Sequence, residues 1–270
     1  MHVESQARDR AGDASYLRAA FETSAAVILN LFSRDRAGPE GDHAPSDPLN
    51  LLRVEYPNLA ELVTGKSVLD FGCGYGHEAA ALAKAYGCKV TGLDTNTHAL
   101  TAARAKHGAL ARFVDRLDGE QFDVVVSQNA MEHFPDPAAV LDTMLAALRP
   151  GGVLLITFGP PWYAPYGSHM HFFCRIPWLN VLFPEAVVMR VRARFRQDGA
   201  WRYEEVESGL NKMTLAKFER FTDRCGIRIE SRRYTAIKGL NALTTIPVLR
   251  ELTTRHVTVV IRAVGRGERP

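Results

Sequence analysis

Short apolar runs alternate with amphipathic segments between residues 66 and 158. The runs are rich in β-branched residues and short enough to be buried strands: KSVLDFG, CKVTGLD, ARFVD, FDVVVSQ and GVLLITFG. Helical spacing appears between them at 78–86, 98–106 and 138–148. This alternation predicts an α/β fold of βαβ units, with a mostly parallel sheet and helices on both faces. The third and fourth runs are too close together for a full helix.

The pattern differs on either side of this region. Residues 1–13 are polar and are expected to be loose, whereas 14–33 carry apolar residues at helical spacing and predict an amphipathic helix. A Gly-, Pro- and Asp-rich loop follows, and then a second helical segment at 49–63, bent near Pro57. These features indicate a helical cap before the sheet.

After residue 158 the alternation stops. The stretch that follows is dense in aromatic residues, prolines and histidines, without a clear period. A helix at 214–225 and strands at 227–237 and 257–264 are expected to close the chain. The basic segment 190–207 reads as a solvent-facing β-hairpin or arm, which could serve a homodimer contact.

The expected architecture is a Rossmann-like sheet of seven strands, with the last strand antiparallel. Residues 1–63 would form an N-terminal helical cap or lid, and 64–158 the cofactor-binding core. Residues 159–212 would form a substrate-cap insertion after the fifth strand, and 213–270 would complete the sheet. The cap and the insertion are expected to roof the cofactor crevice.

Composition narrows the protein class. The chain has 270 residues, 46% apolar and 23% charged, with a net charge of +3, as expected for a globular protein that buries a sizeable core. None of the four cysteines forms a CxxC pair, so neither a zinc knuckle nor a redox motif is indicated. The apolar runs are too short to span a bilayer, and the first residues do not resemble a secretory signal. We therefore expect a cytoplasmic protein.

The run VLDFGCGYG, at residues 68–76, is the most informative segment. A strand that enters a glycine-rich turn and then a helix brings backbone N–H groups close to a ligand. This pattern alone also fits dinucleotide binders. Asp70, just before the glycines, would repel a pyrophosphate but tolerate an ammonium and a sulfonium. Asp94 ends the next strand, where its carboxylate can accept both ribose hydroxyls. Together these two acids favour S-adenosylmethionine.

Four motifs in this order resemble the class I methyltransferase superfamily, in particular its type 11 domain. They cover about residues 62–158: VLDFGCGYG, GLD, FDVVVSQNAMEHFPDP and LRPGGVLLITF. The resemblance implies that the methionine part of S-adenosylmethionine is bound by Asp70, Gly72, Gly74 and Gly76. It implies that Asp94 binds the ribose and that Thr95 and Asp115 contact the adenine. Gln128 and its neighbours would supply backbone contacts. Cys73 would be a small filler in this loop. The alternative is that Asp70 and Asp94 only cap turns.

Two histidines are the candidate catalytic residues. Methyl transfer is an in-line displacement, so a protein base is needed only if the nucleophile holds a proton of high pKa. His133, just past the fourth strand, is either a base or acceptor contact, or a turn histidine that packs against the next helix. His169 lies in the insertion, as a base or acceptor contact. His171 lies close by, but no third ligand completes a metal site, so no metal is expected.

The aromatic residues that open the insertion are the candidate acceptor contacts. Trp162, Tyr163 and Tyr166, with His171, could line an apolar pocket or face the sulfonium. Alternatively, these aromatic residues form a small core of the insertion, which is the interpretation we favour for Trp178 and Phe183.

These features predict methyl transfer to O or N of a small molecule, such as a natural product, a saccharide or a lipid-linked metabolite. Carbon methylation of a quinone-like ring is a weaker variant. A rival hypothesis is a protein that binds S-adenosylmethionine without catalysis, or that uses it for another reaction. The string GPPW resembles a motif of nucleic-acid amino-methyltransferases, but it follows the fifth strand instead of the fourth. We therefore expect a small-molecule acceptor and no nucleic acid.

Overall fold

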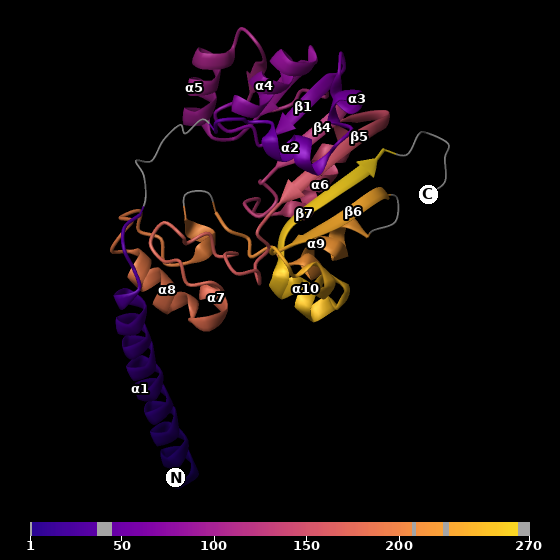
Figure 1. Cartoon of the computed structure of the whole chain (residues 1–270). Helices are drawn as coiled ribbons and strands as arrows, with labels where there is room; N and C mark the ends of the chain where they lie inside the picture. The colour runs from indigo at the N-terminus through magenta and orange to yellow at the C-terminus, as the bar shows by residue number, and fades with distance from the viewer. Residues whose placement is uncertain (1, 37–44, 207–208, 224–226, 264–270) are drawn as a thin grey trace.

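A seven-stranded mixed sheet forms the centre of the molecule (Figure 1). The computed structural model describes residues 2–36, 45–206, 209–223 and 227–263. The strands lie in the order β3-β2-β1-β4-β5-β7-β6. Their bounds are β1 Ser67–Phe71, β2 Lys89–Leu93, β3 Arg112–Val114, β4 Phe122–Gln128, β5 Leu148–Phe158, β6 Arg228–Ala236 and β7 Thr254–Arg262. The first five pair in parallel, and β7 pairs antiparallel with both β5 and β6, which confirms the predicted fold.

Helices cover both faces of the sheet because side chains alternate along each strand. On one face, Val68, Val124 and Val126 pack with α2 (Asn50–Glu55), α3 (Leu59–Val63), α4 (His77–Tyr86) and α5 (Thr97–His107). On the other face, Leu69 and Val125 pack with α6 (Pro137–Ala146) and α9 (Leu215–Thr222). The predicted bend near Pro57 is the break between α2 and α3. As expected, the described chain has no helix between β3 and β4.

The N-terminal helix is longer than predicted. Helix α1 spans His2–Leu31, so the expectation that residues 1–13 are loose is wrong for the described residues from His2. Ala25 and Leu29 are buried against the insertion and belong to its core. The helix projects away from the sheet, beside α8 (Figure 1). The lid function of residues 1–63 stays a prediction.

The insertion after β5 has a hydrophobic core of its own. It contains α7 (Leu179–Leu182), α8 (Glu185–Arg192) and the short 3-10 helix η1 (Tyr203–Glu205). The hairpin or arm predicted at 190–207 is wrong over the described part of that segment, which holds the end of α8 and η1. Val187, Val188 and Val191 are buried at helical spacing, and Arg192 is also buried. Helical periodicity therefore decides the structure, and the charge-rich composition is misleading.

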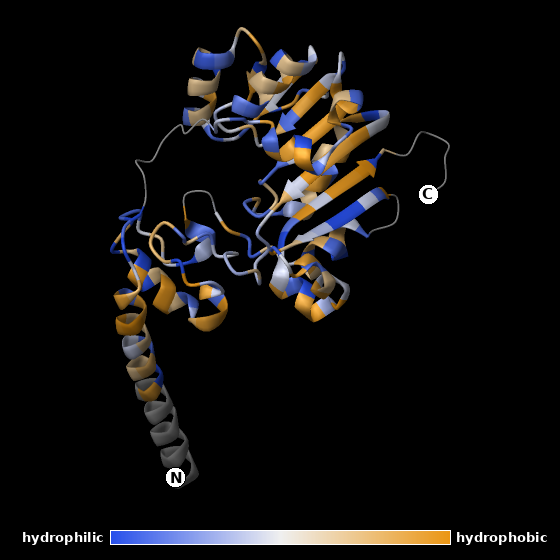
Figure 2. Cartoon of the chain, in the orientation of Figure 1, coloured by the Kyte–Doolittle hydropathy of each residue, from blue (hydrophilic) through white to orange (hydrophobic). Residues whose placement is uncertain are grey.

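The C-terminal part closes the sheet. The short 3-10 helix η2 (Asn241–Thr245) and helix α10 (Pro247–Thr253), which were not predicted, connect β6 to β7. Proline is common in the first turn of helices, so Pro247 was a sequence feature that could have indicated the start of α10. The central strands are mostly apolar, whereas edge strand β6 is mostly polar (Figure 2). Charged residues on an edge strand discourage pairing with another chain.

Candidate functional site

The glycine-rich turn connects β1 to α4. Gly72, Gly74 and Gly76 have φ values of 85°, 49° and 75°, which favour glycine. A Cβ atom at Gly76 would lie 2.5 Å from the ring of Phe113, whereas a Cβ at Gly74 would meet no atom within 4 Å. Gly76 is therefore required by packing, and Gly74 borders open space into which its backbone can offer groups to a ligand.

The structure places Asp94 directly against this turn. Its Oδ2 accepts a hydrogen bond from the N–H of Gly74 at 2.7 Å, and its Oδ1 accepts one from the N–H of Asn96 at 2.8 Å. Thr95, next in the chain, is exposed. The pairing of Leu93 with Val114 puts Asp94 and Asp115 level at the ends of neighbouring strands. The predicted ribose and adenine residues thus share one sheet edge.

A cavity of about 190 Å³ lies beside the glycine turn and contains buried acceptors. The walls include Asp70, Glu78 and Gln128, with Pro45 and Pro48 from the N-terminal segment. Asp70 Oδ2, Glu78 Oε1 and Gln128 Oε1 are buried without a hydrogen-bond partner among the described residues. Buried acceptors without donors are costly, so their grouping here indicates a ligand with N–H groups.

Electrostatics supports a cationic ligand in this cavity. Burial, and secondly the charge of Asp94, raises the pKa of Asp70 to about 7. Burial, followed by the charge of Asp70, raises the pKa of Glu78 well above its usual range. An ammonium group would supply both the donors and the charge that these carboxyls need. The methionine part of S-adenosylmethionine carries such a group, so the residues present fit this cofactor.

Glu78 is not among the predicted site residues. Glu78 lies in the first turn of α4, where an acid ordinarily complements the helix dipole. The sequence therefore offered no reason to assign it to the cavity. Cys73 is buried in the core beside α4 and α5. Burial raises the pKa of the Cys73 thiol, so the thiol stays protonated and unreactive. Cys73 also lines the cavity beside the glycine turn, and its role as a small filler stays a prediction.

The structure brings together the two candidate catalytic histidines, which are far apart in sequence. The rings of His133 and His169 meet edge to face, with centroids 5.5 Å apart. His133 Nδ1 lies 2.8 Å from the carbonyl oxygen of Gly209, to which it must donate because a carbonyl only accepts. The pair lies beyond β4, at the carboxyl-end edge where open α/β sheets bind ligands.

His169 is a neutral imidazole in this setting. Burial, and then the neighbouring His133 and His171, lowers its pKa to about 4. Its Nε2 is buried and has no hydrogen-bond partner among the described residues. The φ of 55° at His169 is unusual for a residue other than glycine, and such positions cluster at functional sites. His169 is therefore unprotonated near neutral pH, and its Nε2 can accept a hydrogen bond from a ligand.

Asn211 connects the insertion to the loop that carries His133. Its Nδ2 donates to the carbonyls of Met131 and Phe134, at 2.7 Å each. Its backbone N–H donates to the carbonyl of Glu132 at 2.9 Å. The Glu132 side chain is buried and its Oε1 accepts from the N–H of Gly159 at 3.3 Å. Asn211 was not predicted, because its role depends on contacts between segments distant in sequence.

The predicted acceptor contacts fall into two groups. Trp162 packs edge to face on Tyr203, at 4.8 Å between ring centroids, as part of the insertion's core. Tyr163 and Tyr166 are 43% and 39% exposed, and the Tyr166 ring lies 4.8 Å from that of His171. A substrate role for all four stays a prediction.

The two aromatic residues assigned to the core also differ. Phe183 packs against the core of the insertion, as expected. Trp178 instead links two elements, since its indole N–H donates to the carbonyl of Leu252 in α10 at 3.3 Å. The indole nitrogen thus joins the insertion to the C-terminal part of the chain.

The described residues 2–36, 45–206, 209–223 and 227–263 contain neither a metal-binding cluster nor a membrane-spanning helix. Within those parts of the chain, no group of three or more His, Cys, Asp or Glu residues could hold a metal ion. No helix in the same residues is long and apolar enough to cross a membrane.

A family model described as a methyltransferase domain matches residues 46–231, more than half of the chain. The chain belongs to this methyltransferase family. Similar curated proteins include the ubiquinone biosynthesis O-methyltransferases of Pasteurella multocida, 34% identical over 140 residues, and of Actinobacillus pleuropneumoniae serotype 7, 37% identical over 135 residues. Each match covers 44% of this chain and 57% of the relative, so the methyltransferase chain spans little more than half the length of these relatives.

Solved structures show the same fold at low sequence identity. An S-adenosylmethionine-dependent methyltransferase from Mesorhizobium loti is 20% identical, with a TM-score of 0.50 over 77% of this chain and 97% of that one. Coclaurine N-methyltransferase bound to S-adenosylhomocysteine is 13% identical, with a TM-score of 0.52 over 86% and 78%. The fold is thus that of the class I S-adenosylmethionine-dependent methyltransferases.

Proposed function

We propose that this chain transfers a methyl group from S-adenosylmethionine to an oxygen or nitrogen atom of a small molecule. The observation that carries the proposal is the cavity beside the glycine turn. There Asp70, Glu78 and Gln128 each present one buried oxygen atom that has no hydrogen-bond partner among the described residues. Membership of the methyltransferase family supports the same reaction.

The chain's own residues position the reactants. Bound S-adenosylmethionine supplies a methyl group that its sulfonium already activates, so orientation is the main task of the protein. Asp70 and Gln128 hold the ammonium end, and Asp94 accepts the ribose hydroxyls. The neutral Nε2 of His169 takes the proton of the acceptor's hydroxyl or amine, and His133 keeps the His169 ring in place.

Oxygen is the favoured acceptor atom. The curated relatives at 34% and 37% identity are named O-methyltransferases of ubiquinone biosynthesis. Carbon methylation of a quinone-like ring stays the weaker variant. A cytoplasmic location and the lack of a nucleic-acid partner stay predictions from the sequence.

Calorimetric titration with S-adenosylhomocysteine tests the cofactor site. We expect a micromolar Kd, about −8 kcal/mol. Asp94→Ala should weaken binding at least about tenfold, since the ribose loses a charged acceptor. Glu230→Ala is the matched control, because Glu230 pairs with Arg262 at the opposite edge of the sheet. Absence of binding to the wild type would overturn the proposal.

A product assay tests turnover. S-adenosylhomocysteine formation is measured with a panel of phenols, catechols and amines, because catalysis requires at least one acceptor. Cofactor binding without product on any acceptor would favour the rival hypothesis, a protein that binds S-adenosylmethionine without methylating.

We also propose a homodimer through α1, in place of the basic arm considered from the sequence. Leu17, Phe21, Ile28 and Leu31 are between 51% and 73% exposed, and their spacing of three, four and seven residues is that of a coiled-coil seam. Light scattering should give twice the mass of one chain for the wild type and a single-chain mass for Phe21→Glu. A monomeric wild type would overturn the dimer.

A further inference from the structure

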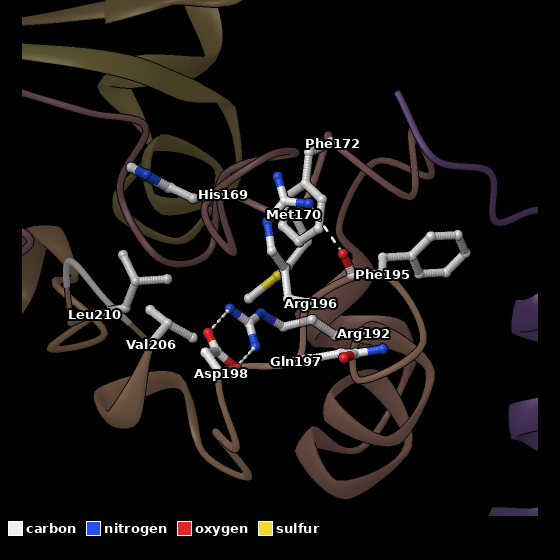
Figure 3. A pocket seen from close by; sticks show the side chains of 10 residues that line it. All are labelled: His169, Met170, Phe172, Arg192, Phe195, Arg196, Gln197, Asp198, Val206 and Leu210. Carbon is white, nitrogen blue, oxygen red and sulfur yellow. Dashed lines mark hydrogen bonds and ion pairs between the residues drawn. The ribbon is translucent and has the colours of Figure 1, made fainter. Parts of the chain in front are cut away.

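Among the described residues, the cofactor cavity takes walls from the N-terminal segment and none from the insertion. Pro45 and Pro48, which precede α2, line it together with residues of β1, the glycine turn, α4 and β4. The insertion encloses a separate cavity of about 580 Å³, lined by residues such as His169 and Met170 (Figure 3). Within the same residues, the two cavities share no wall. The contacts that hold Pro45 and Pro48 in place therefore shape the cofactor cavity.

The turn before α2 is fixed to that helix by Asp47, which lies between the two prolines in sequence. Asp47 Oδ1 accepts a hydrogen bond from the N–H of Leu49 at 3.0 Å, and its carbonyl oxygen accepts one from the N–H of Asn50 at 3.2 Å. Asp47 Oδ2 pairs with Arg53, inside α2, at 2.9 Å. Local hydrogen bonds of this kind define a turn. The prolines therefore keep their places only while α2 keeps its own.

Glu55, the last residue of α2, joins the helix to the sheet. Its Oε2 accepts hydrogen bonds from Thr258 Oγ1 and Arg233 Nη2, at 2.5 Å each, and its carbonyl oxygen accepts one from Arg233 Nη2 at 2.8 Å. The Glu55 side chain is only 4% exposed. Burial by itself would raise the pKa of Glu55, but the hydrogen bonds from Thr258 and Arg233 outweigh it and lower the pKa. The carboxylate is therefore ionised near neutral pH and needs both donors.

The partners of Glu55 lie level with the cofactor cavity. Strand pairing aligns one residue from each of four strands: Gln128 of β4, Thr157 of β5, Thr258 of β7 and Arg233 of β6. Directly paired residues project from the same face of a sheet. One row of side chains thus leads from Gln128, a wall of the cavity, to both partners of Glu55.

A second contact keeps the end of α2 on the sheet. Tyr56, which follows Glu55, is only 2% exposed, and its hydroxyl donates to the carbonyl oxygen of Ile156 at 2.8 Å. Because this contact does not involve Glu55, we expect replacement of Glu55 to shift α2 without releasing it.

We propose that Glu55 is a positioning residue for S-adenosylmethionine, which fixes α2 to β6 and β7 and thereby holds Pro45 and Pro48 against the amino-acid end of the cofactor. The inference rests on the proposed methyltransferase function and specifies how its cofactor cavity is closed. The amino-acid end lies there because Asp70 and Gln128 line the same cavity. Glu55 is not itself a wall, so it acts through α2.

The test compares two ligands that differ at the amino-acid end. 5′-Methylthioadenosine has the adenine, ribose and sulfur of S-adenosylhomocysteine but lacks the amino and carboxyl groups. Calorimetry gives both Kd values, with competition against S-adenosylhomocysteine where binding is weak. Glu55→Ala should weaken S-adenosylhomocysteine at least about tenfold and change 5′-methylthioadenosine less than about twofold. Glu55→Gln should stay within about threefold of the wild type for both, because the amide oxygen still accepts hydrogen bonds.

Glu219→Ala is the matched control. Glu219, in α9, also accepts a hydrogen bond from a hydroxyl, that of Tyr234, and pairs with an arginine, Arg250, at 3.2 Å. Tyr234 directly follows Arg233 in β6, so the two glutamates bind opposite faces of the sheet. Glu219→Ala should lower stability without changing either Kd.

A loss confined to S-adenosylhomocysteine in Glu55→Ala, and absent in Glu219→Ala, supports the proposal. Unchanged affinity, an equal loss for both ligands, or the same selective loss in Glu219→Ala overturns it. If Glu55→Ala does not fold, Arg233→Gln removes the exposed partner of the same pair, and the same selective loss is expected. A wild type that binds neither ligand would overturn the proposed function itself, so the two failures are distinguished.

Discussion

The carboxylate of Asp94 accepts a hydrogen bond from the backbone N–H of Gly74, with 2.7 Å between Oδ2 and N. One side chain at the end of β2 thereby fixes the turn that follows β1. Asp94 also accepts a hydrogen bond from the N–H of Asn96, so its carboxylate orders the loops that follow β1 and β2 before any ligand binds. Such pre-ordering reduces the entropy that a ligand must overcome.

The stability of the free protein should therefore depend on Asp94. Asp94→Ala leaves two N–H groups without their acceptor, and we expect the free energy of unfolding to fall by about 1–2 kcal/mol. Asp94→Asn should lose less, because the amide oxygen can still accept. Urea denaturation monitored by circular dichroism measures both. An Asp94→Ala variant as stable as the wild type would show that the turn does not depend on this contact.

Ligand affinity should depend on pH through Asp70. Its pKa is raised from 3.8 to about 7 in the free protein, while an ammonium ligand favours the ionised form. Binding therefore releases a proton below about pH 7. The affinity for S-adenosylhomocysteine should rise as pH approaches 7 and level off above it. Titrations in two buffers of different ionisation enthalpy measure the proton release. A flat profile between about pH 5 and 8 would contradict this role.

The stability of the free protein should change in the opposite direction. A carboxyl with a raised folded-state pKa holds its proton in the folded state after the unfolded chain has lost it. Stability is therefore lost as pH rises from 3.8 to about 7. Asp70→Asn should reduce this dependence and weaken cofactor binding, while Glu78, whose pKa is also raised, keeps a dependence of the same sign. Denaturation midpoints across the pH range check the sign, and an unchanged slope in Asp70→Asn would assign it to another group.

The proposed base predicts a change in turnover. His169→Asn should lower kcat by about 10²–10⁴ for an acceptor whose nucleophile is protonated. The fall in kcat should be much smaller for an acceptor that is already ionised, because such an acceptor needs no base. The Kd of S-adenosylhomocysteine should stay unchanged in both cases. Equal losses on the two acceptors would show that His169 only shapes the site.

The core of the fold was predictable because it depends on local patterns. The strand alternation, the glycine turn and the acid at Asp94 are each recognisable from a few neighbouring residues, whereas the strand order is known only from the structure. The prediction for 190–207 was wrong because charged residues hid a helical period, which includes the buried Val187 and Val188 just before the segment and Val191 within it. Local composition cannot reveal which face of such a segment will be covered.

The candidate site was predictable only where one motif carries it. Asp70 and Gly74 could be named from the sequence, whereas Glu78 looked like an ordinary acid in a first helical turn. The contact between His133 and His169, and the hydrogen bonds from Asn211 to Met131 and Phe134, join segments that are distant in sequence. These contacts follow from tertiary packing, for which one sequence holds no signal.

Asn211 should be the residue through which the insertion positions His133. Its side chain donates to two carbonyls of the His133 loop, and Asn211→Ala would leave both without a donor. We expect the free energy of unfolding to fall by about 1–3 kcal/mol. Because the loop would no longer hold His133 against His169, kcat should fall, while the Kd of S-adenosylhomocysteine should stay the same.

The Gln121 side chain provides a matched control, which separates an effect of Asn211 on the position of His133 from a general effect on stability. Gln121 donates from Nε2 to the carbonyl of Leu148 at 3.1 Å, at the opposite end of β4 from His133. Gln121→Ala should lower stability without changing kcat at temperatures where both variants are folded. If the two variants lose kcat equally, the loss reflects stability alone. A loss confined to Asn211→Ala would mean that the hydrogen bonds from Asn211 to the His133 loop position His133 for turnover.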